Sequence, residues 1–530
     1  MTKLYLLISL PYTGLNATIR EIPYAQGSRF STEKCCLPRT RTAFLDCIVD
    51  WVNNPDSERA LILFGQAGTG KSAIAHEVAR RFDNMHRLSS SFINRRAEGS
   101  KPYLLFTTLA RDLADRYPSF KAALGRAIQD DTSRRIGARD YSTLFESLLR
   151  QPLRDLHLVG PILVVIDALD ESGDASGSTG LHSFLADHIS ELPSNFRILI
   201  TSRPEKDILD VFSRASTVHL IHTNDPNLSA SVHSDISSYI QGHLDANTFQ
   251  QYGAKLASKA EGLFQWAAVA CGYICSPPPG LTKRKCIHSL LAISSNFEQL
   301  DLLNNLYIQV LEGYFTTSTV RYQFRSIIGP LVAAFQPLSI HSLTTLRQFA
   351  PVDDPDDEES VSAIISHLGS LLSNVTLPEH PIVPLHASFR DFLINKERSG
   401  DFYIDLHDAH HQLVTSCIGL MLHKLKFNIC NLETSYLANS NILNLQSHIT
   451  ENIGSALSYA CCFWDDHLEL ISFKINLTTK LELFFKEKFL FWLEVLSLIG
   501  SVGLASLALS SLKVWLAKSH SVGTFDNSIK

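Results

Sequence analysis

The stretch ALILFGQAGTGKS, residues 60–72, decides the fold of this chain. Residues 60–65 are a short apolar run ending in glycine, which is typical of a buried β-strand. GQAGTGKS at 65–72 fits the pattern GxxxxGK[ST] without deviation. A helical pattern follows, with Ile74 and Val78 on one face. A strand, a glycine-rich loop and a helix in this order predict a P-loop.

The residue types of this loop suit phosphate binding. Glycines let the backbone wrap around phosphates with its N–H groups directed inward, and the positive end of the following helix adds to the attraction. We expect Lys71 to bridge the β- and γ-phosphate oxygens and Ser72 to bind Mg²⁺. The sequence therefore predicts a site for ATP or ADP with Mg²⁺. Its nucleotide-binding residues would be Gly65, Gln66, Ala67, Gly68, Thr69, Gly70, Lys71 and Ser72.

A second apolar run, ILVVIDALDES at 162–172, ends in acids. Because the carboxyl ends of parallel strands meet at one edge of a sheet, we expect Asp167 beside the P-loop as a second Mg²⁺ contact. Asp170 and Glu171 follow at the strand tip, where either could orient an attacking water. We favour Glu171 for that role.

Further apolar runs complete the pattern of the first half. FRILITSR at 196–203 would bring Arg203 to the same edge, where it could sense the γ-phosphate or stabilise charge that develops during hydrolysis. The alternative is a surface arginine that caps the strand. With the run at 217–223, the weaker strand candidate SSSFI at 89–93 and the helical stretches between them, the pattern predicts an α/β P-loop NTPase fold, a parallel sheet with helices on both faces.

Strand signals stop after about residue 225, and the rest of the chain is predominantly helical. Residues 320–395 mix short helices with IVPLH, as a small α/β module of winged-helix size would. With the bounds and roles that a family resemblance of the motifs implies, we expect a short N-terminal extension (1–35), a P-loop NTPase domain (36–224), a helical lid (225–315), a winged-helix-like domain (316–400) and an α-helical region (401–530).

Composition narrows the function classes. A hydrophobic content of 45% with 19% charged residues is typical of a packed soluble protein. The net charge of -6 and the lack of a Lys/Arg block argue against nucleic acid as a partner. The ten cysteines show no zinc spacing, which favours reduced thiols in a cytoplasmic protein. The uncharged stretch 495–512 is at the lower limit for a membrane span. A buried helical hairpin broken near Gly500 to Gly503 explains it equally well, and we expect no membrane span.

Two polar clusters carry weaker signals. HDAHH, with His407, His410 and His411, has helical spacing that could meet a metal, but no second ligand cluster accompanies it. We favour a solvated helix start there. The acidic stretch VDDPDDEES at 352–360 favours a solvated loop.

Several motifs follow one another in a specific order. In that order and spacing the chain, from about Cys36 to about residue 515, resembles the NACHT class of STAND signalling NTPases. The resemblance is to the fungal branch with a nephrocystin-like N-terminal P-loop domain. The motifs are CLPRTR (36–41), GQAGTGKS, VVIDALDES, LITSRPE, EGLFQWA (261–267), LHASFRDFL (385–393), FNIC (427–430) and YACCFWDDHL (459–468).

The resemblance implies residue roles that composition cannot supply. His386 in LHASFRDFL matches the winged-helix histidine that contacts the β-phosphate of ADP and locks the resting state. By itself, such a histidine is more often a buried core residue. Thr40 and Arg41 would lie near the adenine, and Gly262 would pack near the base. Arg39 stands where the family has glycine, which raises the question of the local backbone geometry.

The resemblance also implies a function, a signalling switch such as those of fungal innate immunity or heterokaryon incompatibility. ADP would hold the protein closed, ATP would free surfaces for a homo-oligomer, and slow ATP hydrolysis would reset it. We expect the switch core alone, without an effector domain or sensor repeats, from a truncated gene or with a sensor supplied by a partner. Two other functions stay open, a scaffold with a structural nucleotide site and a P-loop small-molecule kinase.

Overall fold

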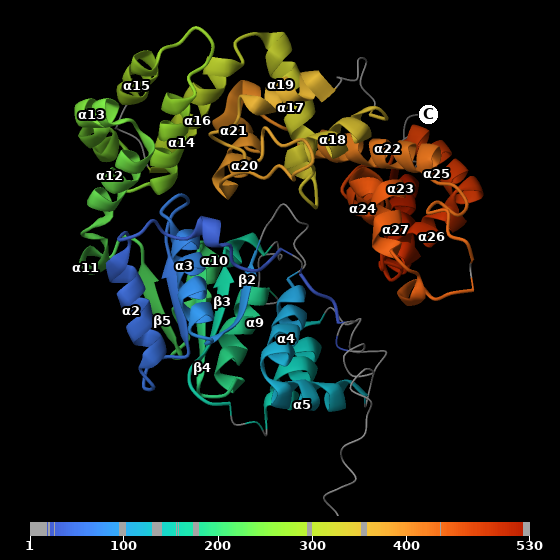
Figure 1. Cartoon of the computed structure of the whole chain (residues 1–530), viewed down its shortest axis with the longest axis horizontal. Helices are drawn as coiled ribbons and strands as arrows, with labels where there is room; N and C mark the ends of the chain where they lie inside the picture. The colour runs from blue at the N-terminus through green and yellow to red at the C-terminus, as the bar shows by residue number, and fades with distance from the viewer. Residues whose placement is uncertain are drawn as a thin grey trace, which may run out of the picture. The chain divides into compact units, whose positions relative to one another are not determined.

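A computed structural model describes residues 22–25, 27–94, 102–129, 140–154, 158–172, 180–293, 299–350, 358–434 and 436–522, with residues 19 and 156. The chain divides into two compact units (Figure 1). One unit ends at Ala268 and takes in the start of a later helix up to Leu302. The other comprises residues 269–293 and the chain after Leu302. Most of the acidic stretch predicted as a loop, 352–357, lies outside the described residues.

One parallel sheet organises the first unit. Its strands lie in the order β2-β3-β4-β1-β5, and every pairing is parallel. The register places Phe64 of β1 opposite Ser202 of β4, so the carboxyl ends of these two strands lie side by side. The predicted α/β class is confirmed. The strands are β1 (Ala60–Phe64), β2 (Leu88–Ile93), β3 (Ile162–Asp167), β4 (Phe196–Ser202) and β5 (Val218–His222).

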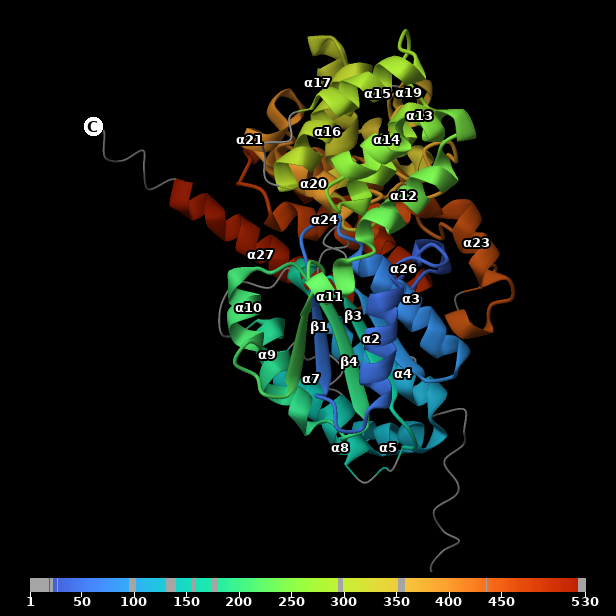
Figure 2. The ribbon, with the colours of Figure 1, turned by 90° about the vertical axis from the view of Figure 1, so that its left-hand side faces the viewer.

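Helices cover both faces of the sheet because successive strand side chains point to opposite sides. Leu61 and Leu63 enter one core, which α2 and α3 close, whereas Ile62 and Phe64 enter the core on the other face. Figure 2 shows α2 and α9 on opposite sides of the strands. The first core uses α2 (Thr42–Asn53) and α3 (Lys71–Asn84), and the second uses α4 (Leu104–Arg116), α5 (Pro118–Gln129), α7 (Tyr141–Phe145), α9 (Leu181–His188) and α10 (Lys206–Phe212).

A helical segment follows β5 within the same unit. It contains α11 (Pro226–Ser229), α12 (Val232–His243), α13 (Ala246–Lys259) and the start of α14 (Phe264–Cys275). Glu261 and Gly262 take left-handed φ values of 47° and 85°, so the chain reverses between α13 and α14. This turn delivers the first residues of α14 to the P-loop.

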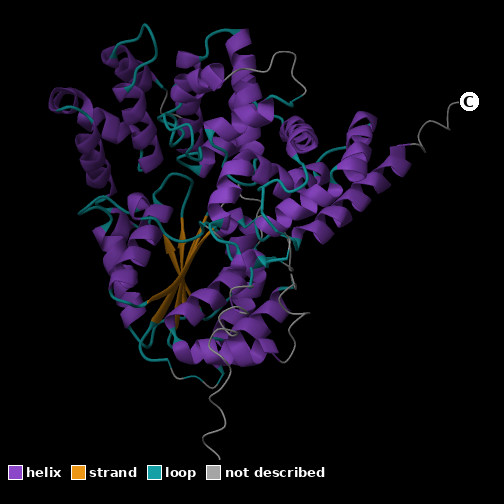
Figure 3. Cartoon of the chain, turned by 45° about the vertical axis from the view of Figure 1, so that its right-hand side comes forward, coloured by secondary structure: helices purple, strands orange, loops and turns teal. Residues whose placement is uncertain are grey.

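Helices are the only regular elements among the described residues of the second unit. IVPLH and the Pro381 before it form only isolated antiparallel bridges, Ser339 with Pro381 and Leu372 with Pro384, because proline has no N–H for a strand ladder. Figure 3 shows strands only in the sheet of the first unit. The helices after α14 are α15 (Lys283–Ala292), α16 (Gln299–Tyr314), α17 (Ser318–Ala333), α18 (Ile340–Arg347), α19 (Glu358–Ser366), α20 (Ala387–Leu393), α21 (Lys396–Ser399), α22 (Leu406–Lys424), α23 (Leu445–Asn452), α24 (Gly454–Glu469), α25 (Ile475–Glu487), α26 (Phe489–Leu498) and α27 (Leu504–Val522).

The uncharged stretch 495–512 forms the end of α26 and the start of α27. Gly500 lies between the two helices with φ of 72°, a left-handed conformation that ends α26. The stretch therefore breaks into two helices near Gly500, as one of the two interpretations predicted, but the start of α27 is not buried, since Leu507 and Leu509 are 37% and 41% exposed. In the part of the chain that the structure describes, no helix is both long and apolar enough to span a membrane.

Candidate nucleotide-binding site

The predicted P-loop connects β1 to α3 as a tight turn. Gly68 and Gly70 have φ values of 83° and 89°, where a side chain would be strained. Gly65 is constrained by space, because a Cβ there would lie 2.2 Å from the Oγ1 of Thr223 and 2.8 Å from the Oγ1 of Thr69. Thr69 Oγ1 donates to the carbonyl of Gln66 at 2.9 Å. The loop thus has the closed form that wraps around phosphates.

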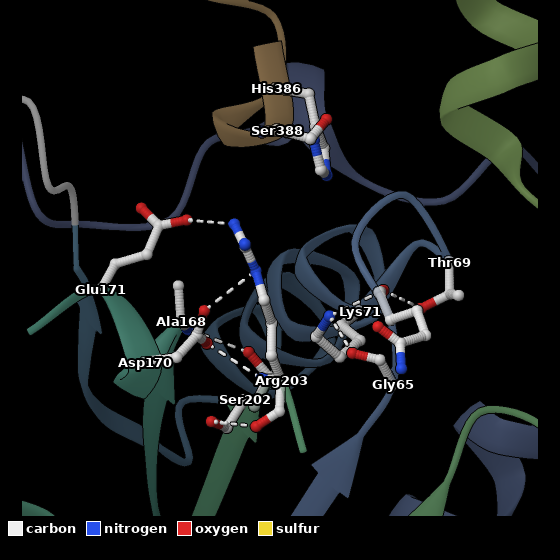
Figure 4. Close-up of polar contacts among 12 residues, drawn as sticks. Gly65, Thr69, Lys71, Ala168, Asp170, Glu171, Ser202, Arg203, His386 and Ser388 are labelled. Carbon is white, nitrogen blue, oxygen red and sulfur yellow. Dashed lines mark hydrogen bonds and ion pairs between the residues drawn. The ribbon is translucent and has the colours of Figure 1, made fainter. Parts of the chain in front are cut away.

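Lys71, the first residue of α3, lies across this loop. Its Nζ donates to the carbonyls of Gly65 at 2.8 Å and Gln66 at 3.1 Å (Figure 4). Burial lowers the pKa of Lys71, and the nearby carboxylate of Asp170 opposes that shift. Ser72 follows in the first turn of the helix and is exposed. The ammonium and the hydroxyl therefore stand where phosphate and Mg²⁺ are expected.

Asp167 ends β3 and is buried at 2% exposure. It accepts a hydrogen bond from the hydroxyl of Thr201 on β4, and the same Oγ1 accepts from the N–H of Ala168 at 2.9 Å. Ala168 has a left-handed φ of 55°, which for a residue other than glycine costs roughly 1–2 kcal/mol. This turn sets Asp170 and Glu171 in a short 3-10 helix directly after the strand.

Arg203 follows β4 and is bound by both of these acids. Its backbone N–H donates to Asp170 Oδ1 at 3.0 Å, and its Nε lies 3.1 Å from Asp170 Oδ2. Its Nη2 lies 3.9 Å from Glu171 Oε1 (Figure 4). The side chain of Arg203 is 22% exposed and that of Asp170 only 4%. The arginine is therefore part of a charged cluster at the carboxyl edge of the sheet, and not a solvated strand cap.

Arg41, directly before α2, is buried against the P-loop. Its Nη2 donates to the carbonyl of Thr69, and its guanidinium lies 4.6 Å from the ring centroid of Phe264. Its backbone N–H donates to Asp235 Oδ2 at 2.9 Å. Burial lowers the pKa of Arg41. The neighbouring Thr40 makes a local turn, since its hydroxyl donates to the carbonyl of Leu37 at 2.8 Å.

Arg39 adopts the backbone geometry that the family's glycine at this position would have. Arg39 has φ of 68°, the left-handed conformation that glycine adopts without strain. The residue is exposed, so its side chain can point into solvent. The chain therefore keeps the geometry that a glycine would give, with some backbone strain.

These residues fit a bound nucleotide with Mg²⁺. Within the described residues, Nε and Nη1 of Arg41 are buried without a hydrogen-bond partner. Buried donors of a cation are costly when they are unpaired, so an acceptor on a ligand would stabilise them. Asp167 and Ser72 offer the oxygen ligands that Mg²⁺ prefers.

Three residues of this site were missed by sequence reasoning as contacts. Asp235 binds Arg41 across a separation of 194 residues, which no local pattern reveals. Phe264 contacts Arg41, and the N–H of Gln265 donates to the carbonyl of Gly68 at 3.1 Å. The only signal for the last two was the motif EGLFQWA. Gly262, in the same motif, forms the turn before α14.

His386 lies in the second unit, at the N-cap of α20. Its Nδ1 accepts from the backbone N–H of Ser388 at 3.1 Å and lies 2.6 Å from the Oγ of Ser388 (Figure 4). The expected contact between His386 and a phosphate stays a prediction.

The prediction of a solvated helix start at HDAHH is wrong for His410. This residue is 7% exposed, and its Nδ1 lies 2.8 Å from Nδ1 of the buried His467. The Nε2 of His467 lies 2.7 Å from the hydroxyl of Tyr459. Burial lowers the pKa of His410 to about 4 and the pKa of His467 well below its ordinary value. Among the described residues there is no group of three side chains that could hold a metal ion.

The parallel sheet and its glycine-rich loop define a P-loop NTPase domain. Residues 40–203 match the family described as nephrocystin 3, N-terminal, so the match covers the loop, the acids and Arg203. No curated protein matches the sequence of the chain.

Solved structures give distant likenesses. A STAND protein with a tetratricopeptide repeat sensor from Pyrococcus horikoshii has 13% identity and a TM-score of 0.37, covering 96% of this chain and 66% of that one. A Walker-type ATPase of Pyrococcus abyssi has 13% identity and a TM-score of 0.32, covering 69% and 98%. The Orc1 protein of Aeropyrum pernix in complex with DNA has 14% identity and a TM-score of 0.31, covering 64% and 86%. This chain thus spans just under two thirds of the first relative, and similarity at this level transfers no function.

Proposed function

We propose that this chain is a nucleotide-dependent signalling switch of the NACHT/STAND type, which binds ATP or ADP with Mg²⁺ and hydrolyses ATP slowly. One observation carries the proposal: Arg203, Asp170 and Glu171, the groups that hydrolysis would use, are bound to one another. An enzyme built for rapid turnover would keep these groups available to substrate. A switch benefits from an arrangement that must be opened first.

The roles within the site follow from its chemistry. Lys71 would hold the β- and γ-phosphates, while Ser72 and Asp167 would bind Mg²⁺. Glu171 would orient the attacking water, since it is farther from Arg203 than Asp170 is. Arg203 would leave Asp170 to meet the γ-phosphate, so nucleotide exchange and ion-pair rearrangement would be linked. Hydrolysis would then reset the switch.

The helical lid after β5 supplies a second link to the nucleotide. Two P-loop carbonyls are held from outside the loop, that of Thr69 by Arg41 and that of Gly68 by the N–H of Gln265. Asp235 of α12 fixes the backbone of Arg41. A change in the loop on phosphate binding would therefore be felt by α12 and α14. A few kcal/mol of differential affinity is enough to shift such an equilibrium strongly.

The remaining parts of the proposal extend the resemblance. His386, in a winged-helix-like segment at 316–400, would contact the β-phosphate of ADP in the resting state. ATP would release that contact and free surfaces for a homo-oligomer, as in fungal immune or incompatibility signalling. Its effector and sensor partners would be proteins, with neither nucleic acid nor membrane required.

The decisive experiment is the identity of the nucleotide in purified protein, together with a Lys71→Ala variant. We expect ADP that is released only on denaturation, and a loss of affinity of at least roughly 100-fold in Lys71→Ala, because the variant removes a charge-assisted phosphate contact. Lys206→Ala, which removes an exposed lysine from the same unit, is the control. Unchanged nucleotide affinity in Lys71→Ala would refute the proposal.

Two outcomes would favour the other functions. Rapid turnover on addition of a small-molecule acceptor would indicate a kinase. A nucleotide-dependent rise in melting temperature without hydrolysis, equal in the wild type and in Glu171→Gln, would indicate a scaffold. The switch predicts slow hydrolysis that Glu171→Gln reduces by roughly 100-fold or more, the usual contribution of a positioned general base.

A further inference from the structure

A directed chain of hydrogen bonds ends at the imidazole of His386. The hydroxyl of Tyr307, on α16, lies 2.8 Å from the Oγ of Ser388, which lies 2.6 Å from Nδ1 of His386. The backbone N–H of Ser388 also points to that Nδ1, at 3.1 Å. All three residues belong to the second compact unit.

The directions of these bonds follow from counting hydrogens. A backbone N–H can only donate, so Nδ1 of His386 must offer its lone pair and carries no hydrogen. Ser388 Oγ, close to the same lone pair, must then donate its single hydrogen to Nδ1. Because that hydrogen is used, the hydroxyl of Tyr307 must donate to Ser388. The ring hydrogen of a neutral His386 is therefore on Nε2.

Packing keeps this chain of bonds in place. Tyr307 is fully buried, and its ring lies 5.2 Å from that of Phe389 and 5.3 Å from that of Phe392, both on α20. Ser388 is 5% exposed. Aromatic contacts of this kind fix the ring of Tyr307, so its hydroxyl cannot turn away from Ser388 without disturbing the packing between α16 and α20.

We propose that Ser388 and Tyr307 are positioning residues that hold His386 as the neutral Nε2–H tautomer, a hydrogen-bond donor for a phosphate oxygen. The inference rests on the proposed function, in which His386 contacts ADP. It specifies the regulation of that site: the histidine senses the nucleotide by one oriented donor and not by a positive charge. An imidazolium would carry hydrogen on both nitrogens and would lose the cap of α20.

The tautomer can be measured without any nucleotide. Side-chain ¹⁵N chemical shifts of His386, assigned by comparison with His386→Asn, distinguish the Nε2–H form, the Nδ1–H form and the cation. We expect the Nε2–H pattern in the wild type. Ser388→Ala keeps the backbone N–H donor to Nδ1 at 3.1 Å but loses the closer hydroxyl donor at 2.6 Å, so part of the population should shift to the Nδ1–H form. An Nδ1–H pattern in the wild type, or an unchanged pattern in Ser388→Ala, would overturn the inference.

Nucleotide affinities then test whether the Nε2–H tautomer of His386 contributes to ADP binding. Ser388→Ala and Tyr307→Phe should each weaken ADP binding by roughly 3–10-fold, the effect of one net hydrogen bond, and should leave ATP affinity unchanged. Tyr314→Phe is the matched control, because it removes a hydroxyl from the same helix that is bonded to the carbonyl of Ser276. Equal losses for ADP and ATP in the test variants, or the same ADP loss in Tyr314→Phe, would overturn the positioning role.

His386→Asn separates this inference from the proposed function. Asparagine is a good N-cap, so α20 should remain intact, whereas the Nε2 donor is lost. Weaker ADP binding in this variant supports the contact. If ADP affinity were unchanged, the proposed phosphate contact would fail, and the ¹⁵N pattern alone would then decide whether Ser388 and Tyr307 fix the ring.

Discussion

The cluster at the sheet edge and the cluster around His386 are held in different ways. At the sheet edge, Lys71, Asp170 and Arg203 are charged groups, brought together because parallel strands end at one edge. Around His386, the partners are neutral and are ordered by a helix cap and aromatic packing. The first cluster depends on charge balance, whereas the second depends on the direction of each hydrogen bond. Perturbations of charge and of geometry should therefore act on different units.

The largest effect on stability is expected from breaking the charge balance at the sheet edge. Asp170→Asn leaves Arg203 without its buried counter-ion, so we expect the first unit to lose about 3 kcal/mol of unfolding free energy. Amide hydrogen exchange in β3 and β4 would measure it. Glu171→Gln is the control, because a pair at 3.9 Å is weaker, and its cost should stay below about 1 kcal/mol. Equal costs for the two variants would mean that the cluster is not organised around Asp170.

Lowering the pH should instead protonate His410, a buried neutral histidine of the second unit. Because the pKa of folded His410 is lowered to about 4, the unfolded chain binds its proton first as the pH falls below about 6.5. The contribution of neutral His410 to the free energy of unfolding is therefore fully present above pH 6.5 and decreases as the pH falls towards 4. The loss from this one group at pH 5 should be about 2 kcal/mol. Amide exchange in α22 and α24, measured against pH, checks it.

A double variant sharpens this prediction. His410→Gln with His467→Gln removes both buried rings and should flatten the pH dependence below pH 6.5. His423→Gln, which removes an exposed histidine from the far end of α22, should leave the curve unchanged. A curve that stays steep in the double variant would show that other groups control acid sensitivity.

The same contrast explains what the sequence could predict. The strands and the P-loop were found because a buried strand is a continuous apolar run, and because phosphate chemistry demands glycines, Lys71 and Ser72 at fixed spacing. The partnership of Arg41 with Asp235 leaves no such pattern, since it joins distant segments, and the left-handed φ of Ala168 leaves none, because alanine ordinarily avoids that conformation. His410 was misread for the same reason: its partner His467 lies on another helix.

The smallest expected effect comes from relieving the backbone strain at Arg39, which forms no part of the charged cluster. Arg39→Gly should stabilise the first unit by roughly 0.5–1 kcal/mol, because glycine adopts the φ of 68° without strain. The greater conformational entropy of glycine in the unfolded chain offsets only part of this stabilisation. Thermal unfolding would measure the gain. Arg39→Ala loses the same side chain and keeps the strain, so it should bring no gain. Stabilisation by alanine would assign the effect to the side chain.

The hydroxyl of Thr201 would affect the speed of the proposed switch. It joins Asp167 to the N–H of Ala168, so the tips of β3 and β4 are tied by a single atom that both donates and accepts. In the proposed switch, nucleotide exchange would then proceed by rotation of the long side chain of Arg203, with the backbone of this edge unmoved. Side-chain rotations take nanoseconds or less, whereas collective movements of elements take microseconds to milliseconds. The slow step of such a switch would therefore lie outside the sheet, in the helices that follow it.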